Sequence, residues 1–427
     1  PIRIFFGSST RMRPNPEPKS DRLLEGRPRQ VLPMNLMMVT RERAGDERFG
    51  MRTSLMPLVQ ALRELGHQVE LLSWASLEAD APELLQRARE AIGARLKAPE
   101  LESQPGLRAL LVDIAAVGWA AVEIALERGI DRLHAHDVIL CAGIDAALRH
   151  HRAAAAPLRW GLSQHSFRST TDAIDDHLMR LSSRLRAALH DWERALLGKA
   201  RWVLTPTRSG RCQLAQDLAL DPIPSHWRVL PHPHPALRAY ERATARACLG
   251  WSQQNFQVIG VGMYLPVKRF DRLIDACAAC APDLHLTLLG DGDARPLRER
   301  AEHSGLGHRL TLTASDDIWL YLFAADLYVS ASATESFGMA NLEALMAGVP
   351  CICSPVGAVP EVVGDAALLV EPDPATLARA ITRLRADGAL RERLRRKAAA
   401  RIAAWPDAVQ TADQFLRIID GVESDAR

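Results

Sequence analysis

The sequence is poor in lysine, has almost no net charge and contains no long uninterrupted apolar run. Lysine occurs only at positions 19, 97, 199, 268 and 397, although lysine and arginine together number 53. A net charge of +2 is too weak to indicate a nucleic-acid partner. Because arginine outnumbers lysine so strongly, each lysine is a candidate for a specific role.

Cysteine is also scarce, with seven residues at positions 141, 212, 248, 277, 280, 351 and 353. An odd number of cysteines, in a chain large enough to fold without disulfides, indicates reduced thiols and a cytoplasmic protein. Cys277 and Cys280 have the spacing of a metal or redox pair. They lie in a helical apolar pattern, however, and no second pair has matching spacing. We predict that both residues pack in the core.

The most apolar stretch, residues 107–126, is interrupted by Asp113 and Glu123. A membrane span needs about 20 mostly uninterrupted apolar residues, so we predict a buried helix here. The N-terminus shows no secretory signal pattern. With 48% hydrophobic and 24% charged residues, the composition is that of a globular protein, and a length of 427 residues indicates two domains.

Short apolar runs alternate with amphipathic segments along the chain, which predicts an α/β fold with parallel strands. Some runs, such as 258–261, are continuously apolar, as expected of strands that are covered on both faces. In the first half, the predicted strands are 34–39, 69–74, 132–136, 158–163 and 202–206. In the second half, they are 257–261, 284–289, 309–312, 327–330, 350–353 and 367–370. A helix is predicted from Thr53, with Gly66 as its C-terminal cap.

Three prolines within residues 231–235 can continue neither a helix nor a central strand, so they mark a linker. We predict a first domain over 31–235 and a second domain over 236–405. Residues 1–30 are polar and rich in proline and arginine, and we predict a loosely structured arm there. A last helix is predicted at about 407–419, within the C-terminal segment 406–427.

The clearest chemical signal is the pair Glu335 and Glu343 at a predicted strand-to-helix junction. The helix that begins near Gly338 offers unpaired N–H groups and a partial positive charge to an anion. Gly338 also lets a ligand approach the backbone. Glu343, inside the helix, could accept two hydrogen bonds from a ribose diol, and Glu335 could bind sugar hydroxyls. Two glutamates at this spacing are otherwise ordinary surface charges, but the junction favours a binding site.

This stretch resembles the E-x7-E motif of the family 4 retaining glycosyltransferases of the GT-B fold, and the resemblance covers about residues 31–420. In the second half, the other matching positions are Gly262 with Lys268, Gly290-Asp291-Gly292, Ala325-Asp326, and Gly357 to Glu361. In the first half, they are Gly50, Leu65-Gly66-His67, His134 to Asp137, and Gln164-His165. Because these positions occur in the order typical of the family, the resemblance is specific.

The resemblance implies two Rossmann-like domains whose parallel sheets face a central cleft. The first domain would bind the acceptor, the second would bind a nucleotide-diphosphate sugar, and the last helix would cross back onto the first domain. Ligands would lie at the carboxyl ends of the strands. By this resemblance, the predicted catalytic residues are His165, Lys268 and Glu335. The predicted donor-binding residues are Gly50, Gly262, Arg269, Ser336, Phe337, Gly338, Met339 and Glu343.

Lys268 matches the phosphate-binding lysine of the family. A fixed cation beside a helix N-terminus would stabilise the negative charge that grows on a departing diphosphate. The sequence departs from the family pattern at Met263, where arginine is usual, and at Arg269, where glycine is usual. Arg269 either replaces the missing cation from the other side of the phosphates or points to solvent. Phe49 replaces the first glycine of the loop that contains Gly50.

His165 matches the active-site histidine of the family, at the end of a first-domain strand. We take His134 and His136 to face opposite sides of their strand, so that at most one of them reaches a site. His232 and His234 have a spacing that suits a metal, but the surrounding prolines favour a linker.

Asp291 and Asp293 resemble the metal-binding D-x-D motif of another glycosyltransferase fold. They follow a second-domain strand, where the family has a Gly-Asp-Gly turn, so we predict no essential metal and no tightly bound cofactor. Residues 178–201 form a basic amphipathic stretch that would suit an anionic membrane surface. Asp191 and Glu193 interrupt it, which favours a solvated face. Peripheral contact with the inner face of a membrane stays open beside the cytoplasmic prediction.

The sequence therefore predicts a retaining glycosyltransferase, with a nucleotide-diphosphate sugar as co-substrate. The acceptor would be a hydroxyl of a glycan, glycolipid or small molecule. One alternative is a catalytically inactive GT-B scaffold that acts as a binding or partner subunit, which Met263 and Phe49 favour. Another is a different GT-B enzyme, such as a nucleotide-sugar epimerase or an inverting transferase. The intact E-x7-E motif favours the retaining transferase over both.

Overall fold

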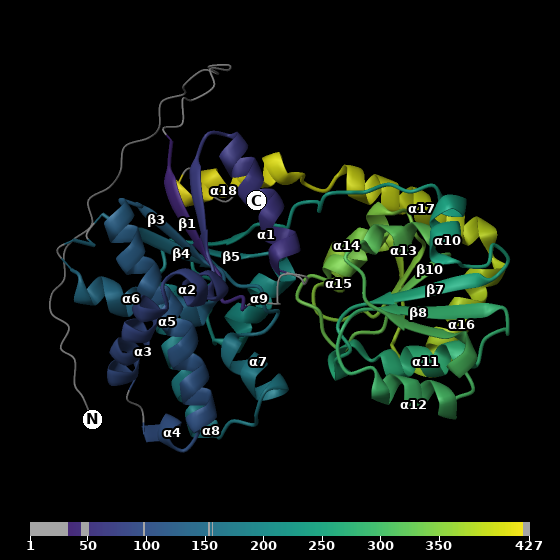
Figure 1. The fold of residues 1–427 in the computed structure, drawn as a ribbon, viewed down its shortest axis with the longest axis horizontal. Coiled ribbons are helices and arrows are strands. Elements are labelled where there is room, and N and C mark those ends of the chain that lie inside the picture. The colour runs from purple at the N-terminus through teal and green to yellow at the C-terminus, as the bar shows by residue number, and fades with distance from the viewer. Residues whose placement is uncertain (1–32, 44–50, 97–98, 153, 156, 422–427) are drawn as a thin grey trace. The chain divides into compact units, whose positions relative to one another are not determined.

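The structure is a computed structural model that describes residues 33–43, 51–96, 99–152, 154–155 and 157–421. The predicted arm over residues 1–30, and the loop that contains Phe49 and Gly50, lie outside the described residues. From Met34 onward, the contacts group the chain into one unit, which contains two six-stranded sheets. Every strand pairs with its neighbours in parallel (Figure 1). The predicted α/β fold with two parallel sheets is confirmed.

The first sheet has the strand order β2-β1-β3-β4-β5-β6. Its strands are β1 (Asn35–Val39), β2 (Gln68–Leu72), β3 (Arg132–Ala135), β4 (Arg159–Ser163), β5 (Val203–Thr205) and β6 (Trp227–Val229). The helices of this half are α1 (Met51–Glu64), α2 (Trp74–Asp80), α3 (Pro82–Arg95), α4 (Pro99–Glu102), α5 (Pro105–Arg128), α6 (Val138–His150), α7 (Thr170–His177), α8 (Ser183–Lys199) and α9 (Arg208–Asp217). Five of the strands match predicted ones within a few residues.

Two details of the first sheet differ from the prediction. The strand predicted to reach Trp74 ends at Leu72, because the Ser73 side chain accepts a hydrogen bond from Ser76 N–H and so begins a helix there. Strand β6 was not predicted, since its three residues are too few to show a period.

The apolar stretch near residue 115 forms α5, which is packed inside the first half. By length and composition this helix could cross a membrane, since its most apolar 18-residue stretch has a mean hydropathy of 2.0. However, 72% of that stretch is buried in the protein. It packs against α6 so closely that a Cβ at Gly143 would lie 1.7 Å from the Ala115 carbonyl oxygen. The prediction of a buried helix is confirmed. Asp113 and Glu123 alone do not make the helix too polar for a membrane span.

The second sheet has the strand order β12-β11-β10-β7-β8-β9. Its strands are β7 (Phe256–Val261), β8 (Leu284–Leu289), β9 (Leu310–Thr313), β10 (Leu327–Ser330), β11 (Cys351–Cys353) and β12 (Ala367–Leu369). The helices are α10 (Arg242–Leu249), α11 (Phe270–Ala278), α12 (Arg295–His303), α13 (Ile318–Ala324), α14 (Met339–Met346), α15 (Val359–Val363), α16 (Pro374–Ala386) and α17 (Gly388–Ala403), with 3-10 turns η2 (Pro266–Lys268), η3 (Gly307–Arg309) and η4 (Gly364–Ala366). All six strands were predicted.

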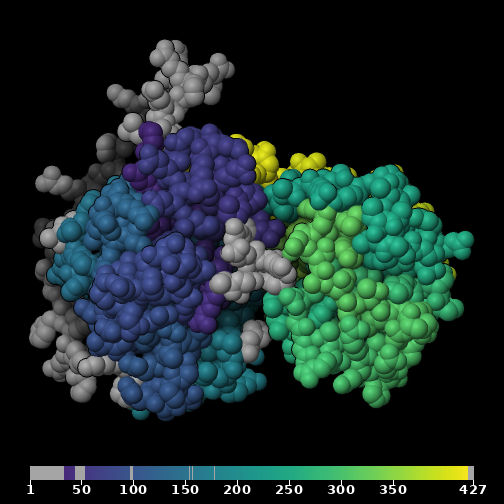
Figure 2. Space-filling model, viewed as in Figure 1, coloured from purple at the N-terminus to yellow at the C-terminus, as the bar shows by residue number. Residues whose placement is uncertain are grey.

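The last helix, α18 (Ala408–Ile419), packs on the first sheet although it follows the second half in sequence. Its buried side chains Ala412 and Phe415 lie in one apolar cluster with Met38 of β1 and Leu62 of α1. In Figure 2, yellow C-terminal atoms accordingly appear against the purple and blue atoms of the first half. The helix begins directly after Trp405-Pro406, because the Asp407 side chain caps its N-terminus.

Candidate functional site

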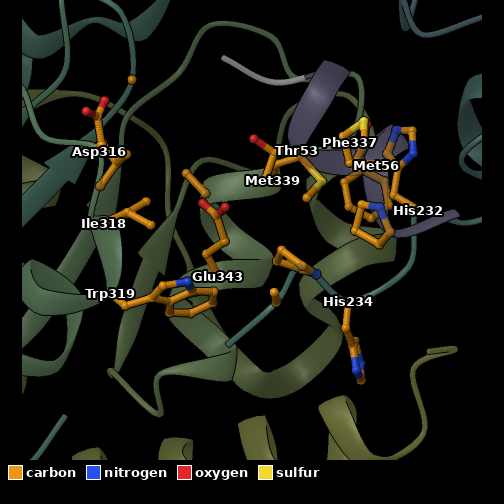
Figure 3. A pocket seen from close by; sticks show the side chains of 18 of the residues that line it. Thr53, Met56, His232, His234, Asp316, Ile318, Trp319, Phe337, Met339 and Glu343 are labelled. Atoms are coloured by element: carbon orange, nitrogen blue, oxygen red, sulfur yellow. The ribbon is translucent and has the colours of Figure 1, made fainter. Parts of the chain in front are cut away.

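A cleft of about 1110 Å³ lies where the carboxyl ends of strands from both sheets converge. Nine of the eleven predicted site residues line it, namely His165, Gly262, Lys268, Glu335, Ser336, Phe337, Gly338, Met339 and Glu343. Figure 3 shows part of this lining, with side chains of α1 on one side and those of α13 and α14 on the other. The chain thus places residues as far apart in sequence as Thr53 and Val409 around one space.

Lys268 and Glu335 form an ion pair at the centre of the second-half wall. The Lys268 Nζ lies 2.5 Å from Glu335 Oε1, and the Ser332 hydroxyl donates to the same oxygen at 2.8 Å. The side chains are 23% and 13% exposed, respectively. The loop that contains Glu335 is fixed to η2 by the hydrogen bond from Ala333 N–H to the Val267 carbonyl at 2.7 Å. Both charges therefore reach the cleft in a defined position.

Gly262 allows the Lys268 side chain to lie across the end of β7. Its φ is 147°, and a Cβ there would lie 2.9 Å from Lys268 Cε. Any larger residue would displace the ammonium group from the cleft wall. Among the described residues that line the cleft, Lys268 has the only lysine or arginine side chain. A bound anion would therefore depend strongly on this one cation.

The N-terminus of α14 opens directly onto the cleft. Gly338 precedes the helix with φ 82° and no side-chain cap, and a Cβ there would lie 2.4 Å from Asn341 Nδ2. Asn341 is held from below, because its Oδ1 accepts a 2.8 Å hydrogen bond from the Tyr328 hydroxyl. The first N–H groups of α14 and the partial positive charge of the helix end thus face the cleft without a competing side chain.

Glu343, one turn into α14, is a buried carboxylate that no described residue pairs with. Its side chain is only 6% exposed, and burial raises its pKa to about 7. No hydrogen bond or ion pair to the carboxylate is formed within the described part of the chain. Figure 3 shows the carboxylate projecting toward the space that Asp316 and Met339 border. A ligand that donates hydrogen bonds would satisfy it.

His165 begins a row of imidazoles on the first-half wall. Its Nε2 lies 2.9 Å from His136 Nδ1, and its ring stacks on that of His232 with the centroids 5.4 Å apart. Burial, and then the charge of Arg41, lower the pKa of His165 to about 4. Burial, and then His165, lower the pKa of His232 to about 3. Near neutral pH this wall therefore presents uncharged rings to a ligand.

The expectation that His134 and His136 face opposite sides of their strand is wrong. The two ring centroids lie 4.8 Å apart, because residues two positions apart on a strand point to the same face. His136 approaches the cleft through His165. His134 packs deeper, where its Nδ1 accepts a 2.9 Å hydrogen bond from Trp202 Nε1.

The structure does not bring Arg269 to the cleft lining. Arg269 begins α11 with φ 48°, a left-handed conformation that glycine adopts more easily, and it is absent from the residues around the cleft. Met263 lines the cleft and is 37% exposed. Arg269 therefore does not supply the cation that the resemblance leads us to expect at position 263. The predicted donor-binding residue Gly50 lies outside the described residues.

Sequence reasoning missed several residues of the cleft. Trp319 and Asp316 lie at and before the start of α13, and Thr53 and Met56 project from α1 (Figure 3). The position of Trp319 shortly after the carboxyl end of β9 was the available signal. His232 was assigned to a linker, and nothing local in its sequence indicates that its ring stacks on His165.

The other polar motifs have structural partners. Asp293 pairs with Arg295 at 2.7 Å, whereas Asp291 lines the cleft. Among the described residues, no group of three His, Cys, Asp or Glu side chains could hold a metal ion. The basic side chains of the stretch 178–201 mostly face carboxylates, as the pairs Arg184–Glu100, Arg186–Asp172, Arg194–Asp191 and Lys199–Asp145 show. Much of its charge is therefore balanced within the protein.

Two family matches divide the chain at the proline-rich linker. Residues 50–234 match the family described as Glycosyltransferase Family 4. Residues 241–401 match the family described as Glycosyl transferases group 1. The first match covers most of the first sheet, and the second match contains the Lys268–Glu335 pair and α14.

A curated relative matches over a shorter length. A D-inositol 3-phosphate glycosyltransferase from Mycobacterium sp. (strain KMS) is 35% identical over 134 residues, which are 29% of this chain and 30% of that protein. The match therefore spans less than a third of the length of that relative.

Solved structures resemble the chain over nearly its whole length. Sucrose-phosphate synthase from Thermosynechococcus elongatus has a TM-score of 0.71 at 20% identity, covering 91% of this chain and 99% of that one. Anabaena Alr3699/HepE, in complex with UDP and glucose, has a TM-score of 0.67 at 17% identity, with coverages of 91% and 99%. At such identities the likeness concerns the fold alone.

Proposed function

We propose that this chain, which belongs to the family 4 glycosyltransferases and has the GT-B fold, moves a sugar from a nucleotide-diphosphate sugar to an acceptor hydroxyl. The observation that supports this most is that groups suited to three different parts of such a donor lie along one wall of the cleft. Glu343 is a buried carboxylate without a partner, and eight residues earlier Glu335 pairs with Lys268 beside the open N-terminus of α14. Glu343 suits the ribose, Glu335 suits the sugar, and Lys268 with the N-terminus of α14 suits the diphosphate.

The diphosphate would bind between Lys268 and the first N–H groups of α14. Breaking the bond from the sugar to the diphosphate leaves negative charge on the phosphate oxygens. A fixed ammonium and a helix N-terminus stabilise that charge more than the charge of the intact donor, which lowers the barrier. Lys268 must then exchange part of its contact with Glu335 for the phosphates. Glu335, released from that contact, accepts hydrogen bonds from the hydroxyls of the sugar.

The ribose would bind at Glu343. A carboxylate that accepts two hydroxyl hydrogen bonds forms strong, charge-assisted contacts, and its burial excludes competing water. Trp319, which is 7% exposed and lines the same end of the cleft, offers a face for the base. Because Anabaena Alr3699/HepE is described in complex with UDP and glucose, UDP and UDP-glucose are the first probes to use.

We propose retention of the anomeric configuration. The leaving phosphate would take the proton of the acceptor hydroxyl as that hydroxyl attacks from the same face, and His165 with Glu335 would hold the sugar. The acceptor would be a hydroxyl of a glycan, a glycolipid or a small metabolite, and it would enter on the first-half side of the cleft. All seven cysteines are free thiols, which suits a cytoplasmic enzyme. Peripheral membrane contact is not required by this proposal.

One observation favours an alternative, a GT-B scaffold without catalytic activity. Met263 stands where the family usually has an arginine, and the cleft wall provides no second cation among the described residues. A scaffold of this kind would bind a nucleotide weakly or not at all.

A thermal-shift panel of nucleoside diphosphates and their sugars tests the proposal, because a ligand that binds only the folded state raises the melting temperature. The variants are Glu343→Ala and, as the matched control, Glu64→Ala, which removes an exposed carboxylate from the same cleft. We expect one nucleotide to stabilise the wild type and Glu64→Ala but not Glu343→Ala. If no nucleotide stabilises the wild type, the scaffold is the better account.

A further inference from the structure

A row of four imidazoles connects the cleft to the interior of the first half. The ring of His232 lies parallel to that of His165 within 6°, and His165 lies nearly parallel to His136 with their centroids 5.2 Å apart. His134 contacts His136 edge-on. Only His165 and His232 line the large cleft, so His136 and His134 contact it indirectly.

The inner end of this row has a fixed proton arrangement. The indole Nε1–H of Trp202 can only donate, so the His134 Nδ1 that it contacts at 2.9 Å must be the acceptor. Neutral His134 then has its proton on Nε2, from which it donates to the Ser163 hydroxyl at 2.9 Å. Burial, and then His165, lower the pKa of His134 to about 3, which keeps this ring neutral.

In the middle of the row, by contrast, one polar atom of His136 lacks a hydrogen-bond partner. His136 is 4% exposed and contacts His165 through Nδ1, but its Nε2 is buried without a hydrogen bond. Thr411 of α18 is 1% exposed, and its Oγ1 likewise has no partner. Buried polar atoms are nearly always hydrogen-bonded, so two such atoms in one place need an explanation.

Both residues line the same small cavity, which has a volume of about 20 Å³. Ser163 and Thr205 contribute further hydroxyl groups to its wall. A cavity needs about 10–15 Å³ of such volume and two to four polar partners to hold one water molecule, and this cavity meets both conditions. One water molecule would provide a partner for the His136 Nε2 and for the Thr411 hydroxyl.

We propose that His136 is a positioning residue for His165, and that one buried water molecule, held by His136 and Thr411, fixes the arrangement. The proposal rests on the proposed function, in which His165 contacts the donor sugar. The imidazoles of His136 and His165 share one proton across their 2.9 Å contact, so the tautomer of one ring determines that of the other. The water bridges the His136 Nε2 to the Thr411 hydroxyl, so the proton arrangement of this bridge is coupled to the tautomer of His136, and thus to whether His165 presents a donor or an acceptor to the cleft.

This arrangement gives α18 a role beyond packing. Thr411 belongs to the helix that returns from the second half onto the first sheet. Its side chain lines the small cavity that His136 also lines.

The first test is the tautomer of His165 in the donor-free protein, read from the ¹⁵N signals of labelled histidine and assigned with His165→Gln. Thr411→Val removes the hydroxyl and keeps the shape of the side chain. Thr287→Val is the matched control, because Thr287 is equally buried with an unpartnered Oγ1 but lies on β8, away from the cavity. We expect a single tautomer in the wild type and in Thr287→Val, and averaged ¹⁵N shifts in Thr411→Val.

The second test uses turnover of UDP-glucose with water as the acceptor. Thr411→Val should lower kcat about 10-fold, below the 10²-fold loss that a displacement of about 1 Å causes, and leave KM within about twofold. His136→Asn, whose amide can replace Nδ1, should retain more activity than His136→Leu. An unchanged His165 tautomer in Thr411→Val would overturn the proposal. If neither UDP-glucose nor any other nucleotide-diphosphate sugar is turned over, the proposed function fails, but the ¹⁵N experiment still decides the role of His136.

Discussion

Replacing Glu343 by glutamine is expected to stabilise the donor-free protein and to weaken nucleotide binding. Burial raises the pKa of Glu343 from 4.5 to about 7. Above pH 7 the folded protein therefore holds a desolvated carboxylate that the unfolded chain exposes to water. At about 1.4 kcal/mol per pKa unit, the folded state loses about 3 kcal/mol of stability. A buried glutamine amide costs about 1 kcal/mol in turn, which leaves a gain of about 2 kcal/mol for Glu343→Gln at pH 8.

The sign of the effect with pH is specific. Because the folded pKa is raised, the penalty is present above pH 7 and is relieved as the pH falls from 7 toward 4.5. The melting temperature of Glu343→Gln should exceed that of the wild type by about 2–3 °C at pH 8, and the difference should disappear near pH 5. Glu64→Gln, which changes an exposed carboxylate on the same cleft, should show no difference at either pH.

The same substitution removes charge-assisted hydrogen bonds to a ribose. Glutamine keeps one acceptor oxygen, so the loss amounts to about one charge-assisted bond, which contributes about 1.5–3 kcal/mol. The Kd for UDP should therefore rise by about 10- to 100-fold, as isothermal calorimetry would show. The reasoning is refuted if Glu343→Gln is less stable than the wild type at pH 8, or if its affinity for UDP is unchanged.

Three further predictions follow from particular contacts. Lys268→Ala should lower the turnover of UDP-glucose by about 10²–10³-fold, measured as UDP release, because it removes the only lysine or arginine side chain among the described residues of the cleft. Gly143→Ala should destabilise the protein by about 1–3 kcal/mol in chemical denaturation, since its Cβ would lie 1.7 Å from the Ala115 carbonyl oxygen. The lowered pKa of His134, about 3, means that the unfolded chain binds a proton below pH 6.5 and the folded protein does not. Relative to a His134→Asn variant, in which the other buried groups are unchanged, the stability of the wild type should therefore fall by about 2 kcal/mol between pH 7 and pH 5.

Each of these outcomes has a clear opposite. Turnover that survives in Lys268→Ala would place the phosphates elsewhere. A stable Gly143→Ala would mean that α5 and α6 separate without loss. The same dependence of stability on pH in the wild type and in His134→Asn would show that His134 is not held neutral by burial.

The sheets could be predicted from the sequence because parallel strands that are buried on both faces consist of short apolar runs. All six strands of the second sheet were found in this way, whereas β6, with three residues, is too short to show a pattern. The end of β2 was misplaced because Ser73 caps a helix whose first residue, Trp74, also suits a strand. A local side-chain hydrogen bond decided the boundary there, and apolar periodicity does not report it.

The second-half wall of the cleft was predicted better than the first-half wall. Glu335, Gly338 and Glu343 lie within nine residues at one junction, so local sequence contains most of their geometry. The row formed by His136, His165 and His232 joins three segments that meet only when the first sheet assembles. No single segment contains the information for such contacts. The prediction for His134 and His136 was wrong because residues two positions apart on a strand point to the same face.

The central claim is that this cleft transfers a sugar from a nucleotide-diphosphate donor, and donor consumption tests it most directly. The wild type and Lys268→Ala would each be incubated with a panel of nucleotide-diphosphate sugars, with and without simple glycan acceptors, while nucleoside diphosphate release is measured. The account predicts that the wild type consumes one donor and that Lys268→Ala loses this activity by about 10²-fold or more. If a nucleotide binds to the wild type but no donor is consumed under any condition, the claim of sugar transfer is contradicted.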